Sequence, residues 1–240
     1  MAASNITMGL VDTPLADISK PMFTIDNVLF TVEDNILNVL LVKRAAPPFN
    51  GCWSLPGGFI DVKLDSNVQA AAMRKLQQKT GLTPSYLEQL EVFSGKDRDP
   101  RGYSISLAFF ALVAFEQVAS HINTVEQARW WPLADLANID LAFDHKQIID
   151  KAYQRLKQKA LYSMLPVFCL PNAFTVSQLK SVIETIIGKE IQRKSLMRRI
   201  EASDMFTLTE QKIASGGRQA QLYKLKDGVD ITLYDRNLSI

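Results

Sequence analysis

Residues 51–82, GCWSLPGGFIDVKLDSNVQAAAMRKLQQKTGL, decide the fold of the first part of this chain. A Leu-Pro-Gly-Gly turn at residues 55–58 leads into an amphipathic segment that ends at Thr80 and Gly81. Glycine just after a periodic segment is a common helix stop. The stretch therefore predicts a glycine turn followed by a helix over residues 67–79, an arrangement typical of phosphate-binding sites.

The same stretch resembles the Nudix box, the signature of enzymes that split nucleoside diphosphates linked to another group. That signature reads Gly, five residues, Glu, seven residues, then Arg-Glu-hydrophobic-any-Glu-Glu-any-Gly-hydrophobic. Residues 74–82 match its frame, but its four glutamate positions hold Ser66, Lys75, Gln78 and Lys79. The loop from glycine to helix is also two or three residues longer than the pattern.

These replacements remove the metal chemistry of the box. Nudix hydrolysis needs Mg²⁺ or a similar hard cation, which requires several oxygen ligands, mostly carboxylates. Two ammonium groups and two neutral side chains cannot collect such an ion, and Asp61 with Asp65 on a lengthened loop make a weak site. We therefore predict no catalytic residues, no metal site and no required cofactor, in a pocket that holds its ligand without consuming it.

Composition places the chain among soluble globular proteins. Its 240 residues are 47% hydrophobic, which suits one large or two modest domains. Its two cysteines form no metal-binding or disulfide pattern. No window approaches the roughly 18 apolar residues of a membrane span, so we expect a cytoplasmic protein with no membrane partner.

Basic residues gather late in the chain. From residue 166 onward, eleven Lys or Arg oppose eight Asp or Glu, while the first 165 residues carry a net charge of −1. Nine of those eleven bases lie within residues 189–226. The asymmetry suggests a second domain with an anionic partner, although a basic surface alone is more often only solubilising.

Four regions are expected along the chain: a poorly ordered arm over residues 1–20, a mixed α/β domain over 21–163, a connector over 164–173 and a DNA-binding domain over 174–240. In the first domain, alternating apolar residues predict a hairpin over 22–32 and 35–43 and strands near 90–94, 103–115 and 130–133. Two helices, over 67–79 and from 144 to about 161, complete it. This order resembles that of the Nudix α/β/α sandwich, which implies its three-layer packing.

The turn Arg-Asp-Pro-Arg-Gly at residues 98–102 resembles one that ADP-ribose-handling Nudix proteins carry beside their ligand. Guanidinium groups pair with phosphate at two points, and a carboxylate accepts ribose hydroxyl protons. A solvated turn is the alternative for this segment by itself. The resemblance implies an ADP-ribose pocket built from Arg44, Gly57, Phe59, Arg74, Lys96, Arg98, Asp99, Arg101, Asp144 and His145.

Two of these residues stand at the start of the closing helix. Asp144 is expected to be its N-cap, in a capping box with Gln147. His145 is expected to have a structural, ligand-binding or interface role rather than a catalytic one.

The second domain has the order helix, turn, basic helix, hairpin. Thr175 is the expected N-cap of the first helix and Gly188 its C-cap. In the basic helix over residues 192–200, Leu196, Met197 and Ile200 share one side. On the helical wheel Lys194, Ser195 and Arg198 face away from it, Arg199 lies on the flank, and Arg193 lies in the exposed first turn.

Strands over residues 206–214 and 219–225, joined by Ser-Gly-Gly-Arg, complete a winged helix-turn-helix, a small α+β domain. Such a basic helix enters the major groove of double-stranded DNA while the wing reaches phosphate or the minor groove. The predicted DNA-contacting residues are Thr175, Gln192, Arg193, Lys194, Ser195, Arg198, Arg199 and Arg218. A basic hairpin that merely packs on the first domain is the alternative.

Together the two halves resemble the Nudix-related transcriptional regulators of NAD metabolism. The resemblance is carried by residues 55–59, 97–102, 141–145, 174–188, 192–199 and 220–223. It implies a homodimer that represses NAD synthesis and salvage genes at a palindromic operator, binds ADP-ribose or a related nucleotide as effector, and leaves the operator when the effector binds. Met197 and Gln219 depart from the family pattern, which puts the operator sequence in doubt.

Two other functions stay open from sequence alone. One is an active Nudix hydrolase, such as an ADP-ribose pyrophosphatase, with an accessory basic domain. The other is an inactive Nudix module that serves as an adaptor for RNA or protein.

Overall fold

The computed structural model describes residues 20–115, 125–215, 218–231 and 233–239, so nearly all of the predicted N-terminal arm lies outside it. Within these ranges, seven strands form one mixed sheet in the order β3-β2-β1-β6-β5, with β4 paired to β1 and β7 to β2. The strands are β1 (Met22–Glu33), β2 (Ile36–Arg44), β3 (Trp53–Ser54), β4 (Gly57–Phe59), β5 (Leu87–Gly95), β6 (Ser104–Leu112) and β7 (Val125–Pro132). No helix in the described ranges is long and apolar enough to span a membrane.

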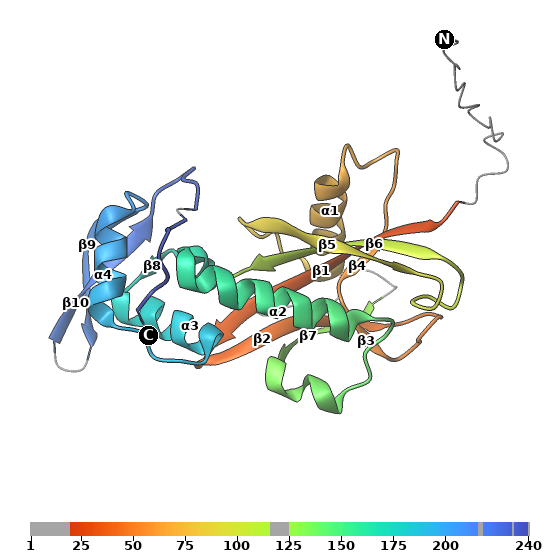
Figure 1. The fold of residues 1–240 in the computed structure, drawn as a ribbon, viewed down its shortest axis with the longest axis horizontal. Helices are drawn as coiled ribbons and strands as arrows, with labels where there is room; N and C mark the ends of the chain where they lie inside the picture. The colour runs from red at the N-terminus through yellow and green to blue at the C-terminus, as the bar shows by residue number, and fades with distance from the viewer. Residues whose placement is uncertain (1–19, 116–124, 216–217, 232, 240) are drawn as a thin grey trace, which may run out of the picture.

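Two helices cover opposite faces of this sheet (Figure 1). Successive side chains of a strand point to opposite faces. Accordingly, Leu29 of β1 packs in a cluster with Leu76 of α1 (Val68–Thr80), and its neighbour Phe30 packs in a cluster with Ile149 of α2 (His145–Tyr162). The three-layer α/β/α sandwich is therefore confirmed.

The ends of these elements follow from local chemistry. Asp34 and Asn35 both have positive φ, the backbone that a tight two-residue hairpin turn requires. The side chain of Asn67 accepts a hydrogen bond from the Ala70 N–H and caps α1, which ends at Gly81 with φ 76°. The predicted hairpin and helix are both present, the helix one residue further along the chain than predicted. The strand predicted near residues 130–133 is the end of β7, and the 3-10 helix η2 (Leu133–Asn138) follows it.

The glycine pair of the sequence motif is required by two different constraints. A Cβ on Gly57 would lie 2.2 Å from the Ile25 carbonyl oxygen and 2.7 Å from Asp26 Oδ1. Gly58 instead has φ +141°, a conformation that residues with side chains rarely adopt. The turn can therefore pack closely against the centre of β1. This contact places the turn, α1 and the loop between them at the same end of the sheet.

The second domain is a small sheet with two helices. Its elements are η3 (Leu165–Cys169), β8 (Ala173–Phe174), α3 (Val176–Ile187), α4 (Arg193–Ala202), β9 (Phe206–Ser215) and β10 (Arg218–Leu225). The three strands pair in the order β8-β10-β9. The predicted helix-turn-helix and hairpin are confirmed, although Gly216 and Gly217 at the hairpin tip lie outside the described residues.

The segment predicted as a connector is part of a continuous core. Met164, Leu165, Val167 and Cys169 are all buried. They belong to one apolar cluster that runs from α2 into α3. Residues 164–173 thus join the two domains as packed structure, and their last residue already pairs in the winged-helix sheet.

The C-terminal segment, residues 233–239, returns to the end of α2. The Tyr234 N–H donates to the Tyr162 carbonyl at 2.8 Å, and the Leu238 N–H donates to the Leu161 carbonyl at 2.8 Å. The Gln192 N–H, at the start of α4, donates to the Ser239 carbonyl at 3.0 Å. This segment, which the sequence did not predict, therefore ties α2 to α4.

Replacing Gly57 by alanine tests the close approach of the turn to β1. We expect Gly57→Ala to lower the free energy of unfolding by about 3 kcal/mol, because the new methyl group collides with backbone. Gly95→Ala is the control, since its Cβ would meet nothing within 4 Å at φ +157°, and it should cost only about 1 kcal/mol. Denaturant unfolding of both variants measures this, and equal losses would contradict the steric argument.

Candidate ligand pocket and nucleic-acid interface

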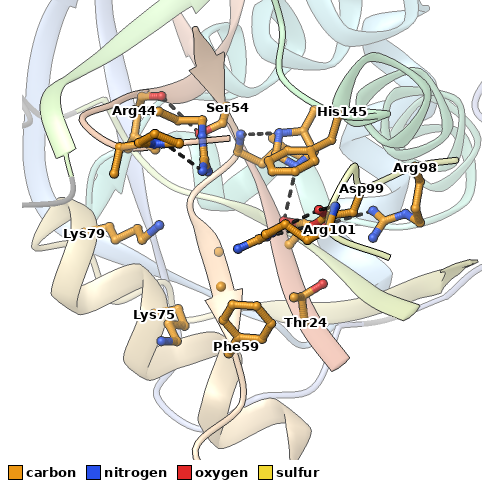
Figure 2. Close-up of a pocket in the computed structure, with 18 of the residues that line it drawn as sticks. Thr24, Arg44, Ser54, Phe59, Lys75, Lys79, Arg98, Asp99, Arg101 and His145 are labelled. Atoms are coloured by element: carbon orange, nitrogen blue, oxygen red, sulfur yellow. Dashed lines mark hydrogen bonds and ion pairs between the residues drawn. The ribbon is translucent and has the colours of Figure 1, made fainter. Parts of the chain in front are cut away.

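A cavity of about 360 Å³ opens where the glycine turn, α1, the loop after β5 and the start of α2 meet. Figure 2 shows side chains from these elements converging on it. It is lined by Thr24, Asp26, Val42, Arg44, Ala46, Pro47, Ser54, Leu55, Gly57, Gly58, Phe59, Lys75, Gln78, Lys79, Arg98, Asp99, Arg101, Phe143 and His145. Its size and mixed lining suit a small organic ligand with polar groups.

Positive charge dominates the lining. Five Arg or Lys side chains face two carboxylates, Asp26 and Asp99. Burial, followed by the nearby Arg44 guanidinium, lowers the pKa of Lys79 to about 8. Burial likewise lowers the pKa of Arg44, and Arg101 is the next cause. Cations that lie close together and are partly removed from water favour the binding of an anionic ligand.

The helix face that carries glutamates in a Nudix hydrolase lies on this cavity. Lys75, Gln78 and Lys79 fall on one side of α1 by their spacing and all three line the pocket. Ser66, at the first glutamate position of the pattern, is exposed and lies outside the lining. The described residues contain no group of three or more His, Cys, Asp or Glu that could hold a metal ion. The donor set therefore does not fit the divalent cation of the hydrolases.

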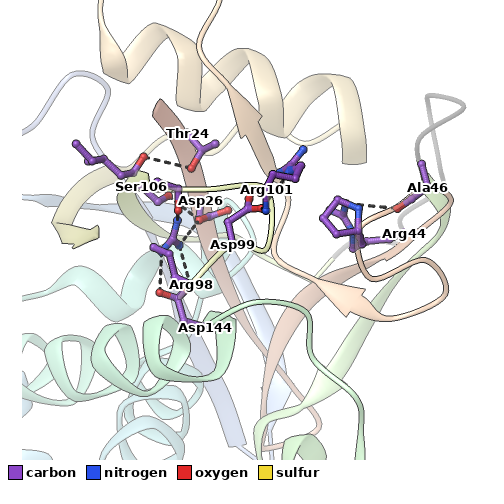
Figure 3. A network of polar contacts seen from close by, with 12 residues as sticks. Thr24, Asp26, Arg44, Ala46, Arg98, Asp99, Arg101, Ser106 and Asp144 are labelled. Atoms are coloured by element: carbon purple, nitrogen blue, oxygen red, sulfur yellow. Dashed lines mark hydrogen bonds and ion pairs between the residues drawn. The ribbon is translucent and has the colours of Figure 1, made fainter. Parts of the chain in front are cut away.

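Asp26, from the centre of β1, lines the pocket. Figure 3 shows it within a network of polar contacts. Its carboxylate accepts a hydrogen bond from Ser106 Oγ at 2.6 Å and lies 3.6 Å from the Arg98 guanidinium. Burial raises the pKa of Asp26, but His145, Ser106 and Arg98 outweigh it and hold the pKa at about 2. The group is therefore an ionised anchor for its neighbours rather than a proton donor.

His145 is used as a structural residue. Its Nδ1 accepts a hydrogen bond from the Leu55 N–H at 2.9 Å, and its Nε2 lies 3.4 Å from Asp26 Oδ1. The ring is 3% exposed. With Nδ1 acting as acceptor and Nε2 facing a carboxylate, the imidazole has no nitrogen left to act as a general base. The structural reading of His145 is supported.

Asp144 corrects a prediction. It is the N-cap residue of α2, but its side chain makes no capping hydrogen bond, so the expected capping box with Gln147 is wrong. Its two carboxylate oxygens instead accept hydrogen bonds from Arg98 at 2.9 and 2.7 Å. A bidentate guanidinium pair outcompetes a single backbone N–H.

Two arginines lie against aromatic rings at the mouth of the cavity. Arg101 pairs with Asp99 at 2.7 Å and lies 5.3 Å from the centre of the Phe59 ring. Arg44 donates to the Pro48 carbonyl at 2.7 Å and lies 4.9 Å from the centre of the Phe143 ring. Flat cationic and aromatic surfaces such as these can stack on a nucleobase.

Some predicted ligand residues lie elsewhere. Arg74 makes two hydrogen bonds of 2.6 Å to Asp65, which itself accepts from the Asp61 N–H, and so stabilises the lengthened loop. Lys96 is exposed, and neither it, Arg74 nor Asp144 lines the cavity. The other seven predicted residues all line it.

Sequence reasoning missed other lining residues, notably Asp26, Lys75, Lys79 and Phe143. For Asp26 a signal existed, because an acidic residue inside the apolar run of residues 22–32 requires buried partners. The Nudix pattern marks Lys75 and Lys79 as replacements of metal ligands and does not predict them as ligand-binding residues.

The candidate nucleic-acid surface is the outer face of α4. Gln192, Arg193, Lys194 and Arg198 are exposed there. Arg193 also donates a hydrogen bond to Ser177 Oγ, at the start of α3, at 3.1 Å. Two arginines, a lysine and an amide on one helix face are the side chains that read base edges and phosphates.

Two predicted DNA-contacting residues are buried: Ser195, which was expected to face away from the core, and Arg199, which was expected on the flank. Ser195 is 9% exposed and Arg199 is 7% exposed. Arg199 donates hydrogen bonds to the carbonyls of Leu161 and Arg236, and stacks 4.5 Å from the Tyr234 ring. The outward orientation predicted for Ser195 was wrong, and Arg199 is not exposed as a DNA contact requires, because the C-terminal segment covers this flank of α4.

Two further predicted DNA residues have limited support. Thr175 is 5% exposed, and its hydroxyl oxygen accepts the Gln178 N–H in a capping box, so the predicted N-cap is confirmed while the side chain is already engaged. The side chain of Arg218, at the wing, lies outside the described residues.

Comparisons with known proteins agree with this two-part architecture. The sequence matches the NUDIX domain family over residues 23–152 and the NrtR DNA-binding winged helix domain family over residues 166–225. It is 37% identical over 209 residues to the ADPR responsive transcriptional repressor NtrR of Acinetobacter baylyi, covering 87% of this chain and 84% of that protein.

Among similar solved structures, one covers most of the chain and another covers its first domain. The crystal structure of Shewanella oneidensis NrtR complexed with a 27mer DNA superposes with a TM-score of 0.82 at 44% identity, covering 90% of this chain and 99% of that one. The cocrystal structure of the NUDIX domain of the same protein with ADP ribose has a TM-score of 0.58 at 41% identity, covering 61% and 96%.

Substitutions at two adjacent arginines of α4 separate a buried role from a surface role. Arg199→Ala should lower the free energy of unfolding by about 2 kcal/mol or more, because it removes hydrogen bonds from a buried charged donor. Arg198→Ala should change it by less than about 0.5 kcal/mol, since that side chain is exposed. Thermal unfolding of both variants is the measurement, and similar stabilities would contradict the assigned orientations.

Proposed function

We propose, because the chain belongs to the family of Nudix proteins that carry an NrtR-type DNA-binding winged helix, that it is a transcriptional repressor controlled by ADP-ribose. The genes it represses belong to NAD biosynthesis and salvage. One observation carries the proposal: a Nudix domain, whose cation-lined pocket has no metal-binding carboxylate set among the described residues, is packed onto a helix-turn-helix with a basic outer face.

ADP-ribose suits the chemistry of the pocket. The cationic lining of α1, β2 and the loop after β5 offers partners for a diphosphate, and Phe59 and Phe143 offer faces for a base. The structure of the related NUDIX domain with ADP ribose supports this assignment. NAD and phosphoribosyl compounds share parts of the same chemistry and are the other ligands to compare.

The DNA partner is a double-stranded palindromic operator. A homodimer presents two copies of α4, and such dimers bind half-sites about 34 Å apart, one turn of the duplex. Exposed Arg193, Lys194 and Arg198 supply the contacts. The structure of the related NrtR with a 27mer DNA supports the assignment of this domain. We place such a repressor in the cytoplasm, as its similarity to the repressor of Acinetobacter baylyi implies.

Helix α2 gives the two sites a physical connection. Its first residues, Asp144 and His145, bind Arg98 and Asp26 beside the pocket. At its other end, the Leu161 carbonyl accepts hydrogen bonds from Arg199 of α4 and from Leu238. Its 18 residues make a rod about 27 Å long. A ligand that shifts the start of α2 therefore displaces α4. In a dimer, this changes the spacing between the two copies of α4.

The chain is not a hydrolase in this proposal. Without a metal-binding carboxylate set, the pocket cannot orient and activate water at a diphosphate in the manner of Nudix enzymes. An active ADP-ribose pyrophosphatase is the second candidate.

Operator release is the first test. Titrating ADP-ribose into a preformed complex of the protein with its own promoter DNA should lower DNA affinity by about tenfold to a hundredfold, the usual range of allosteric coupling. By reciprocity, operator DNA should weaken ADP-ribose binding by the same factor. Fluorescence anisotropy measures both. A complex that survives saturating ADP-ribose would sink the proposed regulation.

A scrambled duplex of the same length, at one fixed salt concentration, separates a repressor from a nucleic-acid adaptor. The repressor should bind its operator at least about a thousandfold more tightly than the scrambled sequence. Equal affinity for both would favour the adaptor, because phosphate contacts alone are sequence-independent.

Turnover is the second test. Incubation with ADP-ribose and Mg²⁺ or Mn²⁺ should release no AMP above the rate without protein. Chromatographic detection of AMP is the measurement, and metal-dependent AMP release would establish the hydrolase instead.

A further inference from the structure

Helix α1 presents two ammonium groups to the pocket where a Nudix hydrolase presents metal-binding glutamates. Lys75 and Lys79 both line the cavity and lie one helical turn apart (Figure 2). Side chains at this spacing project from the same helix face, with Cβ atoms about 6 Å apart. One ammonium can therefore meet each of two neighbouring phosphoryl groups.

Three other arginines near the pocket already have carboxylate partners, while Arg44 donates to the carbonyls of Pro48 and Ala46. Arg98 pairs with Asp144 at 2.7 Å, and Arg101 pairs with Asp99 at the same distance. Arg74, next to Lys75 on the helix, pairs with Asp65 at 2.6 Å. In the part of the chain that the structure describes, no carboxylate lies within ion-pair distance of Lys75 or Lys79.

The two lysines are also partly desolvated. Burial is the largest cause that lowers the pKa of Lys75 and of Lys79, and neighbouring cations, Arg74 and Arg44 respectively, are the next. A cation held out of water without a counter-charge is unfavourable, and a bound anion relieves that cost. Lys75 and Lys79 thus carry charges that a ligand, rather than the protein, is placed to neutralise.

We propose that Lys75 and Lys79 bind the diphosphate of ADP-ribose directly and take the place of the divalent cation of Nudix hydrolases, so that ligand binding needs no metal ion. The identity of the ligand rests on the proposed function. The diphosphate chemistry does not, because any pyrophosphate group meets the same two ammonium ions.

Calorimetric titration of the full chain with ADP-ribose tests this in EDTA and in Mg²⁺. The expected affinities are equal in the two buffers. Lys75→Gln and Lys79→Gln should each weaken binding about tenfold or more in EDTA, since each loses a charge-assisted contact to phosphate. Lys79→Arg should retain most of the affinity. The control, Lys63→Gln, removes the same charge from an exposed position on the neighbouring loop and should bind as the wild type does.

The pH dependence gives a second readout. Lys79 is faced by Arg44 from β2, Asp26 from β1 and Lys75 from its own helix, and its pKa in the free protein is about 8. A bound diphosphate raises that pKa, so binding takes up a proton when the solution pH lies between the two values. ADP-ribose affinity should therefore fall as the pH rises above about 8. In Lys79→Arg this fall should be absent, because arginine stays protonated.

Inorganic pyrophosphate keeps this test separate from the proposed function. It should bind the wild-type chain in EDTA and bind Lys79→Gln at least about tenfold more weakly. Pyrophosphate binding with no ADP-ribose binding would overturn the proposed effector and leave the lysine assignment standing. Binding of either ligand only with Mg²⁺ or Mn²⁺, or wild-type affinity in both glutamine variants at an unchanged unfolding temperature, would overturn the lysine assignment.

Discussion

The buried carboxylate of Asp26 is the interaction on which the geometry of the pocket depends. It lies on central strand β1, accepts a hydrogen bond from Ser106 on parallel strand β6, and is 3.4 Å from His145 and 3.6 Å from Arg98. An ionised carboxylate that is 7% exposed is stable only with such partners. One group therefore fixes the sheet, the loop after β5 and the first turn of α2 relative to one another. The close approach of Gly57 to the same residue adds the glycine turn to this set.

For regulation, this means that a movement at the start of α2 is transmitted to the residues bonded to its other end. A ligand that changes the hydrogen bonds of His145 or Arg98 acts on a rigid helix whose other end is bonded to Arg199 and to the C-terminal segment. The apolar cluster that runs from α2 through η3 into α3 makes the two domains one packed body along this side. Packed interfaces tend to shift between discrete arrangements rather than deform smoothly. The junction is thus suited to two defined orientations of the winged helix.

Local patterns in the sequence predicted the longer strands and helices, because strand alternation, helix caps and glycine stops are short-range signals, but they did not predict the short elements β3, β4, η3 and β8. Thr175 and Gly188 were predicted to cap α3 at single positions, and both caps are present. The errors come from contacts between distant residues. Arg199 points inward because of a segment more than thirty residues later, at Arg236. The Asp144 side chain pairs with Arg98, which lies 46 residues earlier, and does not make the expected capping hydrogen bond. No helical wheel or capping rule contains that information.

The replacement of glutamates by lysines changes what the pocket can report. A carboxylate-lined pocket repels a diphosphate until a divalent cation binds between them, so its occupancy depends on two concentrations. In a pocket lined by Lys75 and Lys79, the protein itself supplies the neutralising charge, and occupancy follows the ligand concentration alone. In the proposed sensor, the same exchange also removes the means of activating water, so that binding does not consume the ligand. Loss of the metal ligands therefore suits a sensor. Its response depends on the ligand concentration alone, and binding does not lower the amount of ligand by hydrolysis.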